Sequence, residues 1–143
     1  MSRMILSTPT PHAFPIRVYY EDTDFSGVVY HASYLRFMER GRTELLRSLG
    51  IDQQAAFSGA DGQAPFGFAV RAMSIEFLKA ASMDDVLTIE TTLGQLGGAS
   101  LELAQRILRG HEVLVAAQVR IACVSQGRAV RVPDFVRKKL AQP

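Results

Sequence analysis

The sequence predicts an α+β fold in which an antiparallel sheet of five strands packs on one long helix. Two patterns lead to this prediction. Apolar residues recur at helical spacing from about residue 33 to residue 49, and four later segments alternate apolar and polar residues with a period of two. One helix followed by a run of strands is typical of a sheet that buries one face against that helix.

The long helix is predicted from an apolar stripe with a marked beginning and end. Ser33 is a suitable N-cap residue, and Gly50 is a suitable C′ residue because glycine tolerates a positive φ angle. The opposite face of the helix is charged, which is typical of a helix that packs with one side on a sheet. One arginine interrupts the stripe, whose members are Leu35, Met38, Arg42, Leu45 and Leu49.

The strands are predicted from alternation and from the turns between them. Gly97-Gly98 and Gly110-His111 indicate turns that join antiparallel neighbours. Residues 1–15 contain three prolines and are expected to form a flexible tail, which leaves residues 16–143 as a single domain. Residues 133–140 are expected to form a short basic helix. The expected strands are residues 16–20, 68–79, 86–93, 100–109 and 113–123.

Composition narrows the classes of protein that fit. The 143 residues are 48% hydrophobic and 21% charged, as in an ordinary globular domain with a core. A formal net charge of +2 is too small to indicate a nucleic-acid partner. The single cysteine, Cys123, excludes a disulfide framework within the chain and a cysteine-rich metal site. The first 15 residues contain no signal peptide or membrane span, so we expect a cytoplasmic protein.

Acidic residues gather directly before the predicted helix. Glu21, Asp22 and Asp24 lie within four positions, Gly27 follows them, and His31 comes just before the helix. Unpaired N–H groups at a helix N-terminus attract anions and can hold a developing oxyanion. A carboxylate beside such amides is a reasonable site for acyl transfer, although an acid in a turn is more often a cap or a solvated charge.

The run from Tyr19 to Leu46, and within it Asp-Thr-Asp-x-x-Gly-Val-Val-Tyr-His-Ala-Ser-Tyr, resembles the signature of the hotdog-fold acyl-CoA thioesterases. The resemblance is to the 4-hydroxybenzoyl-CoA thioesterase branch, and within it to the type encoded with the Tol-Pal cell-envelope genes (YbgC type). It implies a hotdog fold, with the sheet curved around the helix, and hydrolysis of a thioester to a carboxylic acid and CoA. Weaker likeness extends from about Ile16 to Pro133.

The resemblance also implies roles for individual residues. Asp24 corresponds to the catalytic carboxylate, and His31 stands where the branch keeps a histidine. The backbone N–H groups near Tyr30 and His31 are then expected to polarise the thioester carbonyl. Relatives commonly carry Tyr-x-x-Pro-Ala where this chain has Phe77 to Ala81, so any contact made by that tyrosine hydroxyl is absent. The residues expected to contact the substrate are Gly27, Val29, Tyr30 and Phe77.

Several alternatives stay open at this point. Asp24 is expected to act either as the nucleophile or as the general base, and the sequence does not choose between them. His31 is expected to support the site, although a histidine at a helix entrance is often only structural. A metal site with Glu21 and Asp22 is disfavoured, because no second histidine lies near them. Two other functions compete: a hotdog enoyl-CoA hydratase or dehydratase, and a non-catalytic module that binds acyl-CoA or acyl carrier protein.

The expected partners follow from the same resemblance. The substrate is acyl-CoA, with acyl carrier protein as a second candidate, and no bound cofactor is needed because CoA is part of the substrate. We expect a homodimer or a homotetramer, since the exposed edges of the sheet need covering. Four basic residues are candidate partners for CoA phosphates but are more often solvated surface charges: Lys79, Arg106, Arg109 and Arg128.

Overall fold

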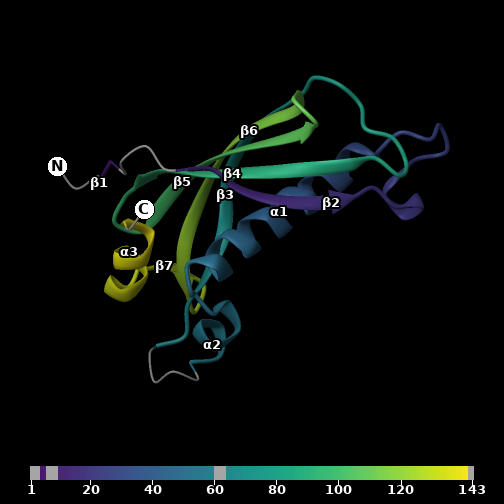
Figure 1. The fold of residues 1–143 in the computed structure, drawn as a ribbon. Helices are drawn as coiled ribbons and strands as arrows, with labels where there is room; N and C mark the ends of the chain where they lie inside the picture. Colours follow the sequence, from purple (N-terminus) through teal and green to yellow (C-terminus); the bar gives the residue numbers. More distant parts are fainter. Residues whose placement is uncertain (1–3, 6–9, 60–63, 142–143) are drawn as a thin grey trace.

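The computed structural model describes residues 4–5, 10–59 and 64–141. The described chain contains one curved sheet with a long helix along one of its faces, two shorter helices and a short 3-10 helix at Tyr20–Asp22 (Figure 1). The helices are α1 (His31–Ser48), α2 (Gln53–Ser58) and α3 (Asp134–Ala141). The strands are β1 (Met4–Ile5), β2 (His12–Arg17), β3 (Gly67–Phe77), β4 (Val86–Leu96), β5 (Ser100–Arg109), β6 (Glu112–Ser125) and β7 (Arg128–Ala129).

All pairings within the sheet are antiparallel, which confirms the predicted sheet type. The order is β1-β4-β5-β6-β3, with β2 also beside β4 and β7 beside β6. Four of the five long strands overlap most of a predicted strand, whereas β2 shares only residues 16 and 17 with the strand predicted at 16–20. Strands β1 and β7, of two residues each, were not predicted. Two short turns, Gly97–Ala99 and Gly110–His111, join β4 to β5 and β5 to β6, as predicted.

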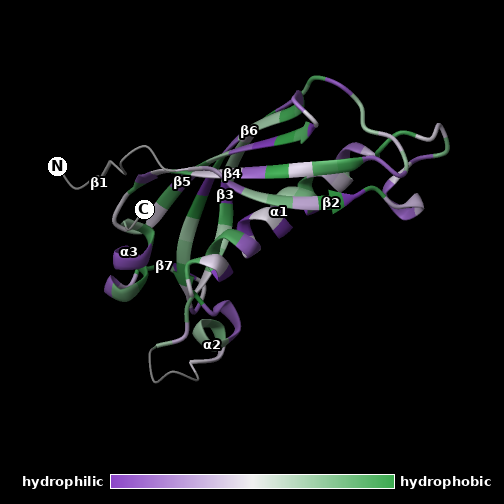
Figure 2. Ribbon diagram, viewed as in Figure 1, coloured by the Kyte–Doolittle hydropathy of each residue, from purple (hydrophilic) through white to green (hydrophobic). Residues whose placement is uncertain are grey.

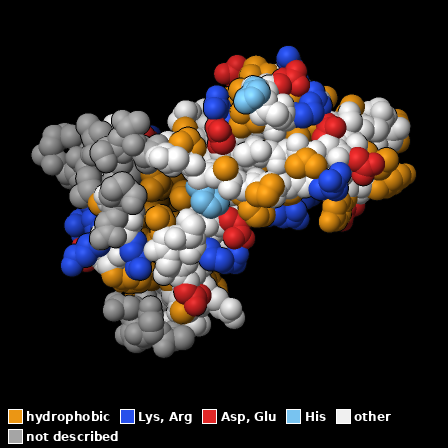
Figure 3. All heavy atoms as spheres, viewed as in Figure 1, with side chains coloured by type: hydrophobic (Ala, Val, Ile, Leu, Met, Phe, Trp, Pro, Cys, Tyr) orange, Lys and Arg blue, Asp and Glu red, His pale blue; other side chains and the backbone are white. Residues whose placement is uncertain are grey.

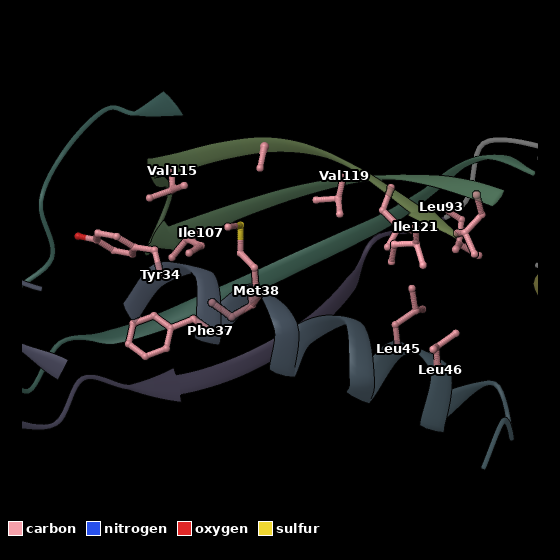
Figure 4. Close-up of a cluster of buried hydrophobic side chains, with 14 of the residues drawn as sticks. Tyr34, Phe37, Met38, Leu45, Leu46, Leu93, Ile107, Val115, Val119 and Ile121 are labelled. Carbon is pink, nitrogen blue, oxygen red and sulfur yellow. The ribbon is translucent and has the colours of Figure 1, made fainter. Parts of the chain in front are cut away.

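The core lies between α1 and the sheet. Figure 4 shows the apolar side chains of α1 pointing at those of β4, β5 and β6. On β4, Leu87, Ile89 and Leu93 are all buried, as the alternation predicts, and Figure 2 shows apolar and polar residues alternating along the strands. Each large apolar side chain buried in this way contributes roughly 1.5–3 kcal/mol to stability.

Helix α1 begins earlier than predicted. Its first residue is His31 and its N-cap is Tyr30, whereas Ser33 is a buried residue of the first turn. The reason is tertiary: the Tyr30 N–H donates to the Asp22 carbonyl at 2.9 Å, which closes the preceding loop and directs the chain into the helix at once. The predicted end is correct. Gly50 has φ +80°, and Ile51 N–H bonds to the Leu46 carbonyl, as in a Schellman motif.

The buried face of α1 is also rotated from the predicted stripe. Leu35 is 41% exposed, while Tyr34, Phe37 and Gly41 are buried. Gly41 makes this packing possible, because a Cβ atom there would lie 2.5 Å from Cγ2 of Ile89 on β4. The absence of a side chain therefore sets how closely the helix approaches the sheet.

The N-terminal boundary differs from the prediction as well. The structure places Met4–Ile5 and His12–Arg17 in strands, so part of the expected tail of residues 1–15 belongs to the sheet. Residues 1–3 and 6–9 lie outside the described residues. Pro15, which argued against a strand, is tolerated because within the described part of the chain β2 pairs on one side only, with β4. No helix among the described residues is long and apolar enough to cross a membrane.

Candidate active site

Asp24 lies in a tight turn between β2 and α1. Its backbone N–H bonds to the Val28 carbonyl at 2.9 Å, and its carbonyl accepts the Gly27 N–H at 3.1 Å. Gly27 has φ +88°, a conformation that favours glycine, and a bridge between Thr23 and Val29 closes the base of the turn. The turn thus holds the Asp24 backbone firmly although the residue itself is exposed.

The Asp24 carboxylate is oriented by Ser26. One of its oxygens accepts hydrogen bonds from the Ser26 hydroxyl at 2.5 Å and from the Ser26 N–H at 2.8 Å. The hydroxyl bond, followed by the N–H bond, lowers the pKa of Asp24 below its ordinary value of 3.8. The carboxylate is therefore ionised at neutral pH.

The Asp24 turn is docked on the connection between β3 and β4. The Val29 N–H bonds to the Ala81 carbonyl at 2.8 Å, and the Met83 N–H approaches the Gly27 carbonyl at 3.4 Å. Ala81 in turn donates its N–H to the buried hydroxyl oxygen of Tyr34 on α1, at 2.9 Å. The turn, the connection and the helix are thus linked by hydrogen bonds into one unit, here called the Asp24 unit, which contains Asp24, Val29, Ala81 and Tyr34.

The N-terminus of α1 opens beside this unit. The Tyr30 N–H donates to the Asp22 carbonyl, and the Ser33 N–H donates to the Tyr30 carbonyl. Among the described residues, no acceptor is found for the N–H groups of His31 and Ala32. These two amides are the donors that remain for an oxyanion at this helix end.

The predicted site residues other than Asp24 and Gly27 fall into two kinds of position. His31 is exposed at the first position of α1, and its ring lies 4.5 Å from that of Tyr30 and 6.1 Å from that of Phe77. Tyr30 and Phe77 are each 48% exposed, so this aromatic group faces outward. Val29 is buried and its N–H is used by Ala81, so it supports the turn from the core side. No hydrogen bond joins His31 to Asp24 within the described residues.

Most of the basic candidates for CoA phosphates are already paired within the chain. Lys79 pairs with Glu112 at 2.7 Å, and Arg106 pairs with Glu90 at 2.8 Å. Arg109 pairs with both Asp85 and Glu112. Arg128 is exposed on β7 and has no ion pair with a described residue.

A buried polar network under α1 was not predicted. The Arg42 guanidinium, on a residue only 9% exposed, donates to Oε1 of Gln105 at 2.9 Å. Gln105 passes its own N–H groups to the Met38 carbonyl and the Thr91 hydroxyl. Burial lowers the pKa of Arg42. The interruption of the apolar stripe was the visible sign of this network, but its partners are too far away in the sequence to be recognised.

A large apolar cavity lies at the other end of α1. It has a volume of about 710 Å³ and apolar walls that include Phe57, Phe66 and Phe68, with Gln53 and Gln54 of α2 at its rim. Phe57 is 76% exposed. Neither Asp24 nor His31 lines this cavity, so within one chain the carboxylate and the apolar cavity are separate. No group of three or more His, Cys, Asp or Glu residues in the described part is arranged to hold a metal ion.

Comparison with known proteins identifies the family to which this fold belongs. Residues 18–140 match the family model described as "Thioesterase-like superfamily". The chain belongs to this superfamily. It is 44% identical over 116 residues to "Acyl-CoA thioesterase YbgC" of Haemophilus influenzae, covering 81% of this chain and 82% of that protein. It is 45% identical over 112 residues to "Acyl-CoA thioester hydrolase YbgC" of Escherichia coli O6:H1, covering 78% and 80% respectively.

A solved structure agrees with these relatives. The "probable thioesterase" from Bartonella henselae superposes with a TM-score of 0.83 at 46% identity, covering 87% of this chain and all of that one. The match confirms the hotdog fold and, at the level of the family, the predicted enzyme class of thioesterase. The roles of Asp24, His31 and the predicted substrate contacts stay predictions, which the geometry above allows us to sharpen.

Proposed function

We propose that the protein is an acyl-CoA thioester hydrolase in which Asp24 attacks the thioester or activates water. One observation carries the proposal: an ionised carboxylate, oriented by Ser26, stands in a rigid turn directly before two open amides of α1 in a thioesterase-family chain. The relatives named above are described as acyl-CoA thioesterases, which supports acyl-CoA as the substrate.

The roles divide between the turn and the helix. The thioester carbonyl oxygen accepts hydrogen bonds from the His31 and Ala32 N–H groups, where the helix dipole stabilises the negative charge that develops. The Asp24 carboxylate then adds to the carbonyl carbon, or removes a proton from the water that adds. The tetrahedral intermediate collapses by breaking the C–S bond. In the nucleophilic route CoA leaves as the thiolate, and water then hydrolyses the mixed anhydride that joins the acyl group to Asp24, which releases the carboxylic acid and the proton that the thiolate takes up. In the general-base route the acid forms directly, and the proton that Asp24 took from water passes to the leaving sulfur. His31, Tyr30 and Phe77 line the approach to the carbonyl.

The mechanism of Asp24 stays a choice between two routes. The lowered pKa keeps Asp24 ionised in the free protein, as both routes require, and it reduces the carboxylate's strength as a base and as a nucleophile alike. If a bound acyl group excludes water from the turn, the pKa of Asp24 rises and the general-base route gains.

The test is the release of thiol from acyl-CoA by the wild-type protein and by Asp24→Asn. We expect Asp24→Asn to lower kcat by at least about 10²-fold without changing the melting temperature, because the exposed side chain contributes little to packing. Glu21→Gln is a matched control, since it neutralises an exposed carboxylate in the same loop. Near-parental turnover by Asp24→Asn would show that Asp24 is not the catalytic group.

The same assay separates the alternatives. A hydratase consumes the enoyl absorbance of its substrate without releasing thiol. A binding module changes neither signal.

The position of the large cavity supports a site shared between two copies of the chain. Strand β3 is an edge strand, because among the described residues it pairs only with β6, and most of its residues are exposed. Such an edge favours pairing with another strand. Antiparallel pairing of two β3 strands about their middle places the Gly67 end of one beside the Phe77 end of the other. The cavity lies at the first end and the Asp24 unit at the second.

We therefore propose that the acyl group bound at one Asp24 enters the cavity of the partner. Two variants test this arrangement with a long-chain acyl-CoA: Asp24→Asn, and Gln54→Trp, which adds a bulky ring at the exposed rim of the cavity. Both should be nearly inactive alone. A mixture that has exchanged subunits should recover about a quarter of the wild-type activity, since half of the dimers are mixed and each holds one intact site. Failure of the mixture to recover, with exchange verified, would show that each chain uses its own cavity.

A further inference from the structure

Four charged side chains form a network beside the Asp24 unit, at the end of the β5–β6 hairpin. They are Lys79, Asp85, Arg109 and Glu112, here called the Arg109 cluster. Arg109 donates to Glu112 from Nε at 3.2 Å and from Nη2 at 2.7 Å, and Lys79 reaches the other oxygen of Glu112 at 2.7 Å. The third nitrogen of Arg109, Nη1, donates to Asp85 at 2.8 Å and approaches the Ala80 carbonyl at 3.3 Å.

Arg109 thereby joins the hairpin to the β3–β4 connection. Asp85 uses the oxygen that binds Arg109 to accept also the Ser82 N–H, at 2.9 Å. Ala80 and Ser82 flank Ala81. The Ala81 carbonyl accepts the Val29 N–H, and the Ala81 N–H donates to the Tyr34 hydroxyl oxygen. A bridge between Val28 and Ser82 adds a second link to the Asp24 turn. The backbone that supports the Asp24 turn is thus fixed to the sheet on both sides of Ala81 by contacts of one guanidinium and its carboxylate partner.

We propose that Arg109 is a positioning residue for thioester hydrolysis: by fixing residues 80–82, it sets the place of the Asp24 carboxylate relative to the open amides of α1. The inference rests on the proposed function. Residues 24–27 of the turn are exposed, so apart from the buried Val29 side chain its geometry depends on hydrogen bonds. A misplacement of about 1 Å between reacting groups lowers a rate by about 10²-fold.

An arginine suits this task for a geometric reason. Its planar fork reaches Glu112 on one side and the 80–85 segment on the other with a fixed angle between them. A lysine presents a single ammonium group, which can keep one of these partners in place but not both rigidly. The three guanidinium nitrogens make four hydrogen bonds within the chain, so Arg109 holds the loop with four of its five N–H donors and keeps one for any other partner.

The test compares Arg109→Gln with Arg106→Gln. Arg106 is a close control, because it lies on the same strand and also forms a two-nitrogen ion pair, with Glu90, but does not contact the β3–β4 connection. We expect Arg109→Gln to lower kcat for acyl-CoA by about 10²-fold at a temperature where the protein is folded, with little change in KM. Arg106→Gln should retain the wild-type kcat. Arg109→Lys should recover only part of the loss, and Asp85→Asn provides a milder second variant.

Amide hydrogen exchange gives a readout that does not need activity. In Arg109→Gln, the Val29 and Ala81 amides should exchange faster than in the wild type, while buried amides of β5 should not. Unchanged exchange at Val29 and Ala81 overturns the proposal whether or not the protein hydrolyses acyl-CoA. Three kinetic results would also overturn the proposal. They are an unchanged kcat in Arg109→Gln, an increase in its KM alone, which would indicate phosphate binding, and an equal loss of kcat in Arg106→Gln. Absence of thiol release by the wild type would instead overturn the proposed function.

Discussion

Replacing Gly41 by alanine should destabilise the protein, because helix α1 has no space for a methyl group where it crosses β4. The added Cβ would lie 2.5 Å from Cγ2 of Ile89 and 3.2 Å from the Thr91 hydroxyl oxygen. Two carbon atoms in contact normally stand about 3.5–4.0 Å apart, so the helix or the strand must move by about 1 Å. Neither moves easily, since Ile89 is fully buried and β4 is paired on both sides.

Two opposing effects set the size of the change. Alanine is favoured over glycine within a helix by about 1 kcal/mol. Overpacking of a core typically costs about 1–3 kcal/mol, and a 1 Å overlap with a buried β-branched side chain belongs at the upper end. The net loss in the free energy of unfolding is therefore about 2 kcal/mol, which lowers the melting temperature by about 8 °C in a chain of this size.

Thermal unfolding and urea denaturation, followed by circular dichroism, measure this change. Gly98→Ala is the matched control, because a Cβ at Gly98 meets no atom within 4 Å. A second control places Gly41→Ala in an Ile89→Leu background, where the β-branch that carries Cγ2 is gone and the penalty should shrink. A melting temperature of Gly41→Ala at or above that of the wild type would refute the argument from close packing.

Two further predictions concern charged groups. Gln105→Leu should lower the free energy of unfolding, measured by urea denaturation, by about 3 kcal/mol, because it leaves the buried Arg42 guanidinium without its acceptor. The double variant with Arg42→Met should recover most of this loss. Equal stability of the single and double variants would contradict the prediction. The Asp24 carboxyl should titrate below pH 3.8 in carbon-13 NMR, and Ser26→Ala should raise its pKa towards the ordinary value; an unchanged midpoint would show that Ser26 does not hold the carboxylate.

The sheet could be predicted from the sequence because each strand carries its own signal. Leu87, Ile89 and Leu93 alternate with polar residues and are buried together on one face of β4, so the local pattern and the tertiary environment agree. Strand β2 is different. Pro15 and the nearby prolines are typical of an irregular tail. His12–Arg17 forms a strand because it pairs with β4. A signal that depends on a partner 69 to 79 residues away cannot be recognised in a local window.

Helix α1 was predicted as an element, and three residues of its predicted stripe, Met38, Arg42 and Leu45, are buried, but the centre of the buried face was not predicted. Leu35 and Leu49 fit the helical repeat, yet Leu35 is exposed, and Gly41 lies at the closest contact with the sheet. Glycine lowers helix propensity and contributes nothing to an apolar stripe, so a count of apolar residues places the buried face wrongly. The start of the helix was misplaced for a similar reason: Ser33 is a good N-cap by type, but the bond from Tyr30 to Asp22 decides where the helix begins.

The candidate site shows the same division between local and long-range information. Asp24 was found because the acids, Gly27 and the following helix are contiguous in the sequence. Arg109 was judged a surface charge, because nothing near it in sequence relates it to Asp24, and its contacts arise only when the β5–β6 hairpin meets the β3–β4 connection. The groups proposed to react are therefore visible in the sequence, whereas those proposed to fix their geometry appear only in the fold.

Activity among related chains should vary with the contacts that hold the Asp24 turn in place. The groups proposed to react lie in an exposed turn, and hydrogen bonds to segments distant in sequence help to hold that turn in place. A chain can keep Asp24 and Gly27 and still lose rate if the contacts of residues 80–82 change, because misplacement affects the transition state more than the fold. Retention of the Asp24 motif thus predicts the type of reaction, and the partners of Ala81 and Arg109 predict how well it is carried out.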